Sequence, residues 1–197
     1  AANRRMVDFR RDGFDAAVRF GFGRYGDAYV RKLFNEGMVP LCSPRLLEGP
    51  EPLRRPEDLR RFPLLHDISV QTFDPDAPTW DTWLAAAGVE GVDTAHGISF
   101  DHAELALQAA LGGAGVLLGR RMLAQADLDA GSLVMPFDLV VPFGLAYYFV
   151  CPQEVAHLPK TQHFLEWLAS EVAATFVAGE PVPFVEDRLP PAGGGQA

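Results

Sequence analysis

Cysteine and long apolar runs are both scarce in this chain. Its two cysteines, Cys42 and Cys151, lie far apart, and neither has metal-ligand spacing to the other or to any of the five histidines. We expect two reduced thiols, with a disulfide or a reactive thiol as the alternatives. No apolar run reaches the roughly eighteen residues of a membrane span, and the N-terminal sequence AANRRMVDFRRDG has no signal-peptide core. We therefore expect a cytoplasmic protein with no membrane partner.

Positive charge is also in short supply. The sequence has 17 Lys and Arg against 26 Asp and Glu, a formal net charge of −9 and a pI of about 4.9. A surface of this sign repels phosphate backbones. Nucleic-acid binding by this polypeptide alone is therefore not expected.

Sequence motifs of catalysis and cofactor binding are missing as well. The chain has no GxSxG elbow, no HExxH, no P-loop, and no GxGxxG that follows a strand. Ser99, Asp101 and His102 have the side chains of a catalytic triad, but successive residues of a strand end and a helix start point in different directions. We therefore expect no enzyme activity, no metal and no cofactor.

The most informative segment that is present runs from Ser99 to Gly119, SFDHAELALQAALGGAGVLLG, in a chain that is 48% hydrophobic. Asp101 is expected to cap a helix, and Glu104 to complete a capping box. Small and apolar residues then recur at helical spacing: Ala103, Ala106, Leu107, Ala110 and Leu111. The glycines from Gly112 to Gly115 are expected to end the helix in left-handed backbone. The segment predicts a β-α-β unit whose helix starts at the carboxyl end of a strand, where ligands bind in open α/β folds.

Short strands and helices alternate along the rest of the chain. We expect strands over Phe14 to Phe20, Tyr29 to Phe34, Met38 to Cys42, Leu64 to His66, Leu133 to Phe137 and Leu145 to Cys151. We expect helices over Trp80 to Ala87, Arg120 to Ala130 and Lys160 to Val177. The sequence Asn35-Glu36-Gly37 is a turn signal, and residues 178–197 have the composition of a disordered tail. This alternation predicts an α/β fold in which parallel strands predominate.

Several segments resemble, in order, the effector-binding domain of LysR-type transcriptional regulators. They are FDAAVRFG, VPLCSP, WDTWLAAAG, FDHAELALQAALGGAGVLLG, GSLVMPF, AYYFVCP and FLEWLASEV. The likeness covers Val7 to Val177 and is strongest to the branch that includes glycine-cleavage and β-lactamase regulators. It departs from the family pattern where His102 and Ala103 replace the small hydroxyl residues that often open the helix.

The resemblance implies two Rossmann-like α/β subdomains joined by two crossover strands around a cleft, as in type 2 periplasmic binding proteins. Subdomain one would hold residues 1–35 and 147–177, and subdomain two residues 36–146. The crossovers would lie near Phe34 to Gly37 and near Ala146 to Phe149. The family's N-terminal winged helix-turn-helix, its linker helix, and the strand and helix that open subdomain one are expected to be missing from this chain.

The resemblance also implies where an effector binds. The implied effector-binding residues are Arg19, Phe20, Gly21, Phe22 and Gly23 after the first strand, Asp101, His102 and Ala103 at the helix start, and Tyr147 at the second crossover. Glycines let the backbone approach a ligand, an aromatic ring can close over it, and a helix start attracts a carboxylate or phosphate. Each group has a structural alternative: an ordinary turn, a structural ion pair of the arginine, a helix cap beside a surface histidine, and a half-buried strand tyrosine.

The function implied is the sensory half of a transcriptional regulator that binds a small, anionic effector. Self-association as a dimer or tetramer is expected, and DNA binding only through the missing N-terminal domain. The alternatives are a solute-binding protein of a transporter, which shares the fold, and a truncated, nonfunctional regulator.

Overall fold

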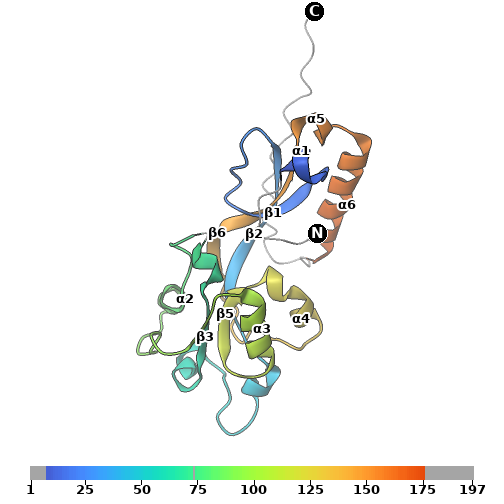
Figure 1. Ribbon diagram of the computed structural model, residues 1–197. Helices are drawn as coiled ribbons and strands as arrows, with labels where there is room; N and C mark the ends of the chain where they lie inside the picture. The colour runs from blue at the N-terminus through green and yellow to red at the C-terminus, as the bar shows by residue number, and fades with distance from the viewer. Residues whose placement is uncertain (1–7, 73, 176–197) are drawn as a thin grey trace, which may run out of the picture. The chain divides into compact units, whose positions relative to one another are not determined.

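The computed structural model describes residues 8–72 and 74–175, and Figure 1 shows its helices and strands. The strands are β1 (Ala17–Gly21), β2 (Tyr29–Leu41), β3 (Leu64–Asp67), β4 (Ile98–Phe100), β5 (Val116–Arg120) and β6 (Val141–Cys151). The α-helices are α1 (Phe9–Asp12), α2 (Trp80–Ala87), α3 (Ala103–Leu111), α4 (Gln125–Asp129), α5 (Gln153–Ala156) and α6 (Pro159–Thr175). The 3-10 helices are η1 (Pro44–Leu47), η2 (Pro56–Arg61), η3 (Ile68–Thr72) and η4 (Met122–Ala124). The expected tail, residues 178–197, lies outside the described residues.

The chain divides into two compact units. Unit 1 comprises residues 1–35 and 145–197, and unit 2 comprises residues 36–144. Hydrogen-bonded strands follow the order β1-β6-β2-β5-β3-β4. The α/β prediction is confirmed, but the predominance of parallel strands is wrong. β3 pairs in parallel with β4 and β5, whereas β1 with β6 and β2 with β5 are antiparallel.

Helices cover both faces of the strands in unit 2, with α2 on one side of β3 and β5 and α3 and α4 on the other (Figure 1). Successive strand residues enter opposite cores, because side chains alternate across a sheet. Leu64 packs with Trp80 and Trp83 under α2, whereas Leu65 packs with Ala106 under α3. The two tryptophan N–H groups donate to backbone carbonyls, at 3.1 Å and 3.0 Å, so their burial leaves no polar atom unpaired.

The predicted β-α-β unit is present as β4, α3 and β5, with β3 lying between the two strands. Its capping prediction is wrong. The N-cap position is held by His102, not Asp101, and the His102 side chain makes no capping hydrogen bond. The left-handed backbone is confined to Gly113, whose φ is 79°, while Gly112 is right-handed at φ −69°.

Two further predictions are wrong because pairing distant in sequence overrides local signals. The segment Asn35-Glu36-Gly37 is the middle of the continuous strand β2, not a turn. Glu36 is buried, and its Oε1 accepts hydrogen bonds from the backbone N–H groups of Gly37 and Met122, at 3.0 Å and 3.2 Å. The strand expected over 133–137 is reduced to a single bridge between Val134 and Cys42.

Unit 1 contains the antiparallel pair of β1 and β6, with Ala17 opposite Val150 and Gly21 opposite Ala146. Helix α6 buries Leu165 and Val172. None of the helices in the described ranges is long and apolar enough to cross a membrane.

Candidate functional site

Three aromatic rings stack in unit 1, and two of them come from the predicted site. Phe20 on β1 lies opposite Tyr147 on β6, with ring centroids 4.9 Å apart. Tyr147 stacks on Phe34 of β2 at 4.6 Å and an interplanar angle of 27°. We call Phe20, Phe34 and Tyr147 the aromatic stack. It offers apolar ring faces beside one phenol that can make a hydrogen bond.

The opposite face of the same strand pair carries the other predicted residues of β1. Arg19 and Gly21 flank Phe20, and neighbouring residues of a strand point to opposite sides. The hydroxyl of Tyr25 lies over Gly21, 2.7 Å from where a Cβ would be, and the ring of Tyr148 covers Gly23 in the same way at 2.8 Å. The strand therefore separates Phe20 from Arg19 and Gly21, so the predicted residues of unit 1 form two groups rather than one.

The group on this second face contains two tyrosines that sequence reasoning missed. The rings of Tyr25 and Tyr148 meet edge to face, with centroids 6.0 Å apart. Burial raises the pKa of Tyr25, an effect that the charge of Arg19 partly offsets, and burial also raises the pKa of Tyr148. Both phenols therefore stay protonated as donors at neutral pH. The buried Tyr25 hydroxyl has no hydrogen-bond partner within the described ranges.

The loop after β1 presents Phe22 to solvent, with 49% of its surface exposed. A signal for Tyr25 was available, because it continues the same glycine- and aromatic-rich segment, GFGRYG. Phe34 gave no local signal. Its neighbour Tyr147 comes from the far end of the chain, and only the strand order brings the two together.

The start of α3 in unit 2 holds the remaining predicted residues. His102 and Asp101 contact each other through Nδ1 and Oδ1 at 2.9 Å, and both side chains are exposed. Ala103 is buried against the sheet. A first helical turn has N–H groups that lack intrahelical acceptors, and it carries a partial positive charge. This arrangement suits an anionic ligand group only where the Asp101 charge stays engaged with His102.

Neither cysteine has the surroundings of a reactive thiol. Cys42 and Cys151 are buried and free, and burial raises their pKa values to about 12 and about 11. No cluster of three or more His, Cys, Asp or Glu side chains within residues 8–72 and 74–175 is arranged to hold a metal ion.

Comparison with known proteins assigns the chain to a family. The model of the LysR substrate binding domain matches residues 1–173. The chain belongs to this family. The resemblance seen in the sequence is thereby confirmed.

Relatives of this LysR domain are transcriptional regulators rather than enzymes. It is 37% identical over 170 residues to the glycine cleavage system transcriptional activator of Escherichia coli, a match that covers 86% of this chain and 53% of the relative. It is 31% identical over 166 residues to the HTH-type transcriptional activator AmpR of Citrobacter koseri, covering 84% of this chain and 54% of the relative. The LysR domain thus spans about half the length of the curated relatives it matches.

The fold of the LysR domain is also that of solved effector domains. The effector domain of the transcriptional regulator AmpR of Pseudomonas aeruginosa matches it with a TM-score of 0.64 and 27% identity, over 86% of this chain and 77% of that chain. The AmpR effector-binding domain of Citrobacter freundii matches with a TM-score of 0.64 and 26% identity, over 86% and 80%. Both belong to the periplasmic-binding-protein-like fold that the sequence predicts.

Proposed function

We propose that this chain is the effector-sensing part of a LysR-type transcriptional regulator that binds a small anionic metabolite and has no catalytic activity. The observation that carries the proposal is the family match over residues 1–173, together with the 37% identical transcriptional activator. Regulators among the relatives favour this function over that of a solute-binding protein. The proposal includes a location in the cytoplasm, self-association as a dimer or tetramer, and contact with DNA through a part of the regulator other than this domain.

Three groups of residues, each described within its own unit, are separate candidates for contact with such an effector. The aromatic stack of unit 1 provides apolar ring faces, and the Tyr147 phenol donates a hydrogen bond to a polar group. In unit 2 the first turn of α3 provides backbone donors, with His102 beside them for a carboxylate or phosphate. On the opposite face of β1, apart from the aromatic stack, Arg19 supplies a positive charge for an anionic group, while Gly21 and Gly23 let Tyr25 and Tyr148 lie close to the backbone.

A thermal-shift screen of small anionic metabolites, amino acids included, tests the proposal. A true effector binds the folded chain and raises its melting temperature with concentration, because ligand binding stabilises the native state by mass action. For each compound that does so, we expect Tyr147→Phe to weaken the shift and Tyr29→Phe to preserve it. Tyr29 is the matched control, since its ring packs against Phe149 and not against the aromatic stack.

The same screen tests the start of α3 with substitutions of two histidines, one at the helix start and one as a control. His102→Gln should reduce the shift caused by anionic compounds, whereas His163→Gln, an exposed histidine on α6, should leave it unchanged. Two results would contradict the proposed function. One is that no compound stabilises the unsubstituted chain, and the other is that the shift in melting temperature is unchanged by substitution of Tyr147 and of His102.

A further inference from the structure

Unit 2 contains a cavity that is lined by none of the predicted effector residues. Its volume is about 310 Å³, and Phe62, Val92 and the first residue of β3, Leu64, are among the residues that line it. Gly97, at the entrance to β4, lines it too. The cavity therefore lies at the amino ends of the parallel strands β3 and β4, whereas α3 starts beyond the carboxyl end of β4.

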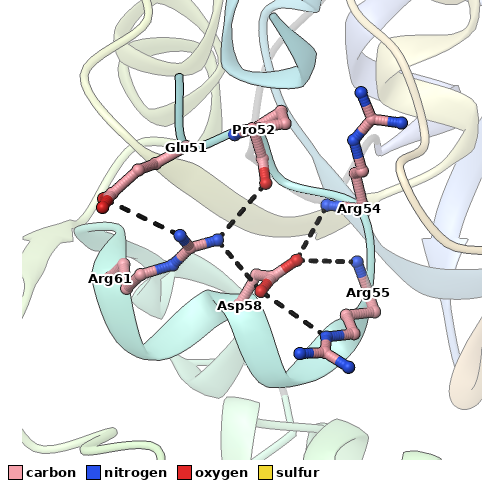
Figure 2. A network of polar contacts seen from close by, with 6 residues as sticks. All are labelled: Glu51, Pro52, Arg54, Arg55, Asp58 and Arg61. Atoms are coloured by element: carbon pink, nitrogen blue, oxygen red, sulfur yellow. Dashed lines mark hydrogen bonds and ion pairs between the residues drawn. The ribbon is translucent and has the colours of Figure 1, made fainter. Parts of the chain in front are cut away.

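A network of polar contacts ties η2 to the chain before it (Figure 2), and two other residues of η2, Leu59 and Arg60, line the cavity. Asp58 accepts hydrogen bonds from the backbone N–H groups of Arg54 and Arg55, at 3.0 Å and 3.1 Å. It also pairs with Arg61 at 2.9 Å, and Arg61 donates to the carbonyl of Pro52 at 3.3 Å. These contacts hold the chain before η2 against the helix and engage the guanidinium of Arg61.

Arg60, the residue before Arg61, has a different role. Arg60 lines the cavity, and this exposed residue makes no side-chain ion pair or hydrogen bond with any residue in the described ranges. Beside it, Phe62 and Val92 supply apolar surface, and both are partly buried against the core. A guanidinium next to an aromatic ring and an aliphatic side chain suits a ligand with a carboxylate at one end and an apolar body at the other.

The negative charge in the cavity is already engaged. Oδ2 of Asp93 contacts Nδ1 of His96 at 2.5 Å, and its Oδ1 accepts the backbone N–H of Ala95 at 3.0 Å. The hydrogen bond from His96 is the main cause that lowers the pKa of Asp93, so this carboxylate stays ionised and bound to its neighbours. The contact also fixes one nitrogen of the His96 ring and leaves Nε2 for a polar group of a ligand.

Glycine is required where the cavity wall meets β3. A Cβ on Gly97 would lie 2.3 Å from the carbonyl oxygen of Leu64 and 2.6 Å from Nε2 of His66. The close approach brings the segment that carries Asp93 and His96 alongside β3. The wall is therefore built by a specific backbone contact.

We propose that this cavity is a second ligand site, which binds a small monocarboxylate with an aromatic or branched apolar body. Arg60 binds the carboxylate, Phe62 and Val92 contact the apolar body, and Asp93 orients His96 at the rim. The site is separate from the effector residues of the proposed function and does not depend on them.

Titration of the isotope-labelled full chain with phenylacetate, followed in proton–nitrogen correlation spectra, tests the site. We expect saturable shifts in the amides of residues 59–62 and 92–97. Phenylacetamide has the same shape without the charge, and we expect it to bind at least about tenfold more weakly, because it loses a charge-assisted hydrogen bond.

Arg60→Gln should weaken phenylacetate binding by a similar factor. Arg54→Gln is the matched control, since its exposed side chain carries the same charge and lies outside both the cavity and the contacts of Asp58 (Figure 2). The absence of saturable shifts in the two segments, equal binding of phenylacetamide, or equal losses in the two arginine variants would each overturn the site. If Arg60→Gln does not fold, the comparison of the two compounds on the unsubstituted chain decides.

Discussion

At the scale of single residues, two glycines of one run in unit 2 differ in how closely their backbone approaches a neighbour. Gly112 and Gly115 belong to the same run, GGAG, after α3. A Cβ on Gly115 would lie 2.2 Å from the carbonyl oxygen of Pro63, which already accepts the N–H of Val116 at 2.9 Å. A Cβ on Gly112 would come no closer than 3.4 Å to any neighbour. The run as a whole is a helix end, but its last glycine is a packing contact with the chain before β3.

We predict that Gly115→Ala destabilises the protein by about 2 kcal/mol or more, because backbone atoms on both sides must move apart. Gly112→Ala should change the free energy of unfolding by less than about 0.5 kcal/mol, because its backbone is already right-handed. Urea unfolding of the two variants beside the unsubstituted chain measures the difference. Equal midpoints for the two variants would contradict the packing role of Gly115.

The two thiols give a second residue-scale prediction. Because the pKa values of Cys42 and Cys151 are raised to about 12 and about 11, both thiols stay protonated and buried at neutral and mildly alkaline pH. Ellman's reagent should therefore react with neither in the folded chain and with both in urea. Rapid reaction in the folded chain would reveal an exposed thiolate, and no reaction in urea would reveal a disulfide.

At the scale of elements, the sequence predicts correctly those helices whose ends are set by local contacts. Helix α2 spans the predicted range Trp80–Ala87. Its buried residues share one face, and the helix ends at Gly88, whose φ of 68° is left-handed. The predictions of a strand over 133–137 and of a turn at 35–37 are wrong because contacts distant in sequence determine both segments. Glu36 lies inside β2, and its Oε1 accepts the backbone N–H of Met122, a contact distant in sequence that no local pattern reveals.

The same limit applies to the candidate site. The sequence predicted that residues 19–23 and Tyr147 act together, and the register does place Phe20 opposite Tyr147. Strand alternation then puts Arg19 and Gly21 on the other face. Phe34 joins the stack only through the pairing of distant strands, so a local pattern could not identify it.

Asp58 gives the element-scale prediction, because it holds η2 and the preceding chain together. Hydrogen bonds from the backbone of Arg54 are the main cause that lowers its pKa below the ordinary value of 3.8. A carboxyl with a depressed folded-state pKa stabilises the protein above its unfolded-state pKa, and that contribution disappears as the pH falls through the folded-state pKa. Asp58→Asn should therefore be less stable than the unsubstituted chain at neutral pH.

The difference between the two proteins should shrink below pH 3.8 and vanish at lower pH. Urea unfolding across this range measures it, with Glu57→Gln as the control for loss of an exposed charge in the same helix. A difference that is constant with pH would show that the Asp58 carboxylate is not the group responsible.

At the scale of the whole molecule, the order of elements and the family match agree that this is a LysR substrate-binding domain. Its net charge of −9 suits a sensor of small molecules better than a surface that binds phosphate backbones. The relatives regulate transcription, and this chain corresponds to about half of their length. The central proposal is therefore that the chain senses an effector, with the aromatic stack and the first turn of α3 as separate candidate contacts.

Shift mapping with the strongest stabilising compound from the metabolite screen tests that claim most directly. Proton–nitrogen correlation spectra of the labelled chain should show saturable shifts in at least one of three segments: residues 19–23, Tyr147 and the start of α3. Tyr147→Phe should weaken the binding, with Tyr29→Phe unchanged. Saturable shifts that avoid all three segments, with binding unaffected by Tyr147→Phe, would contradict the account.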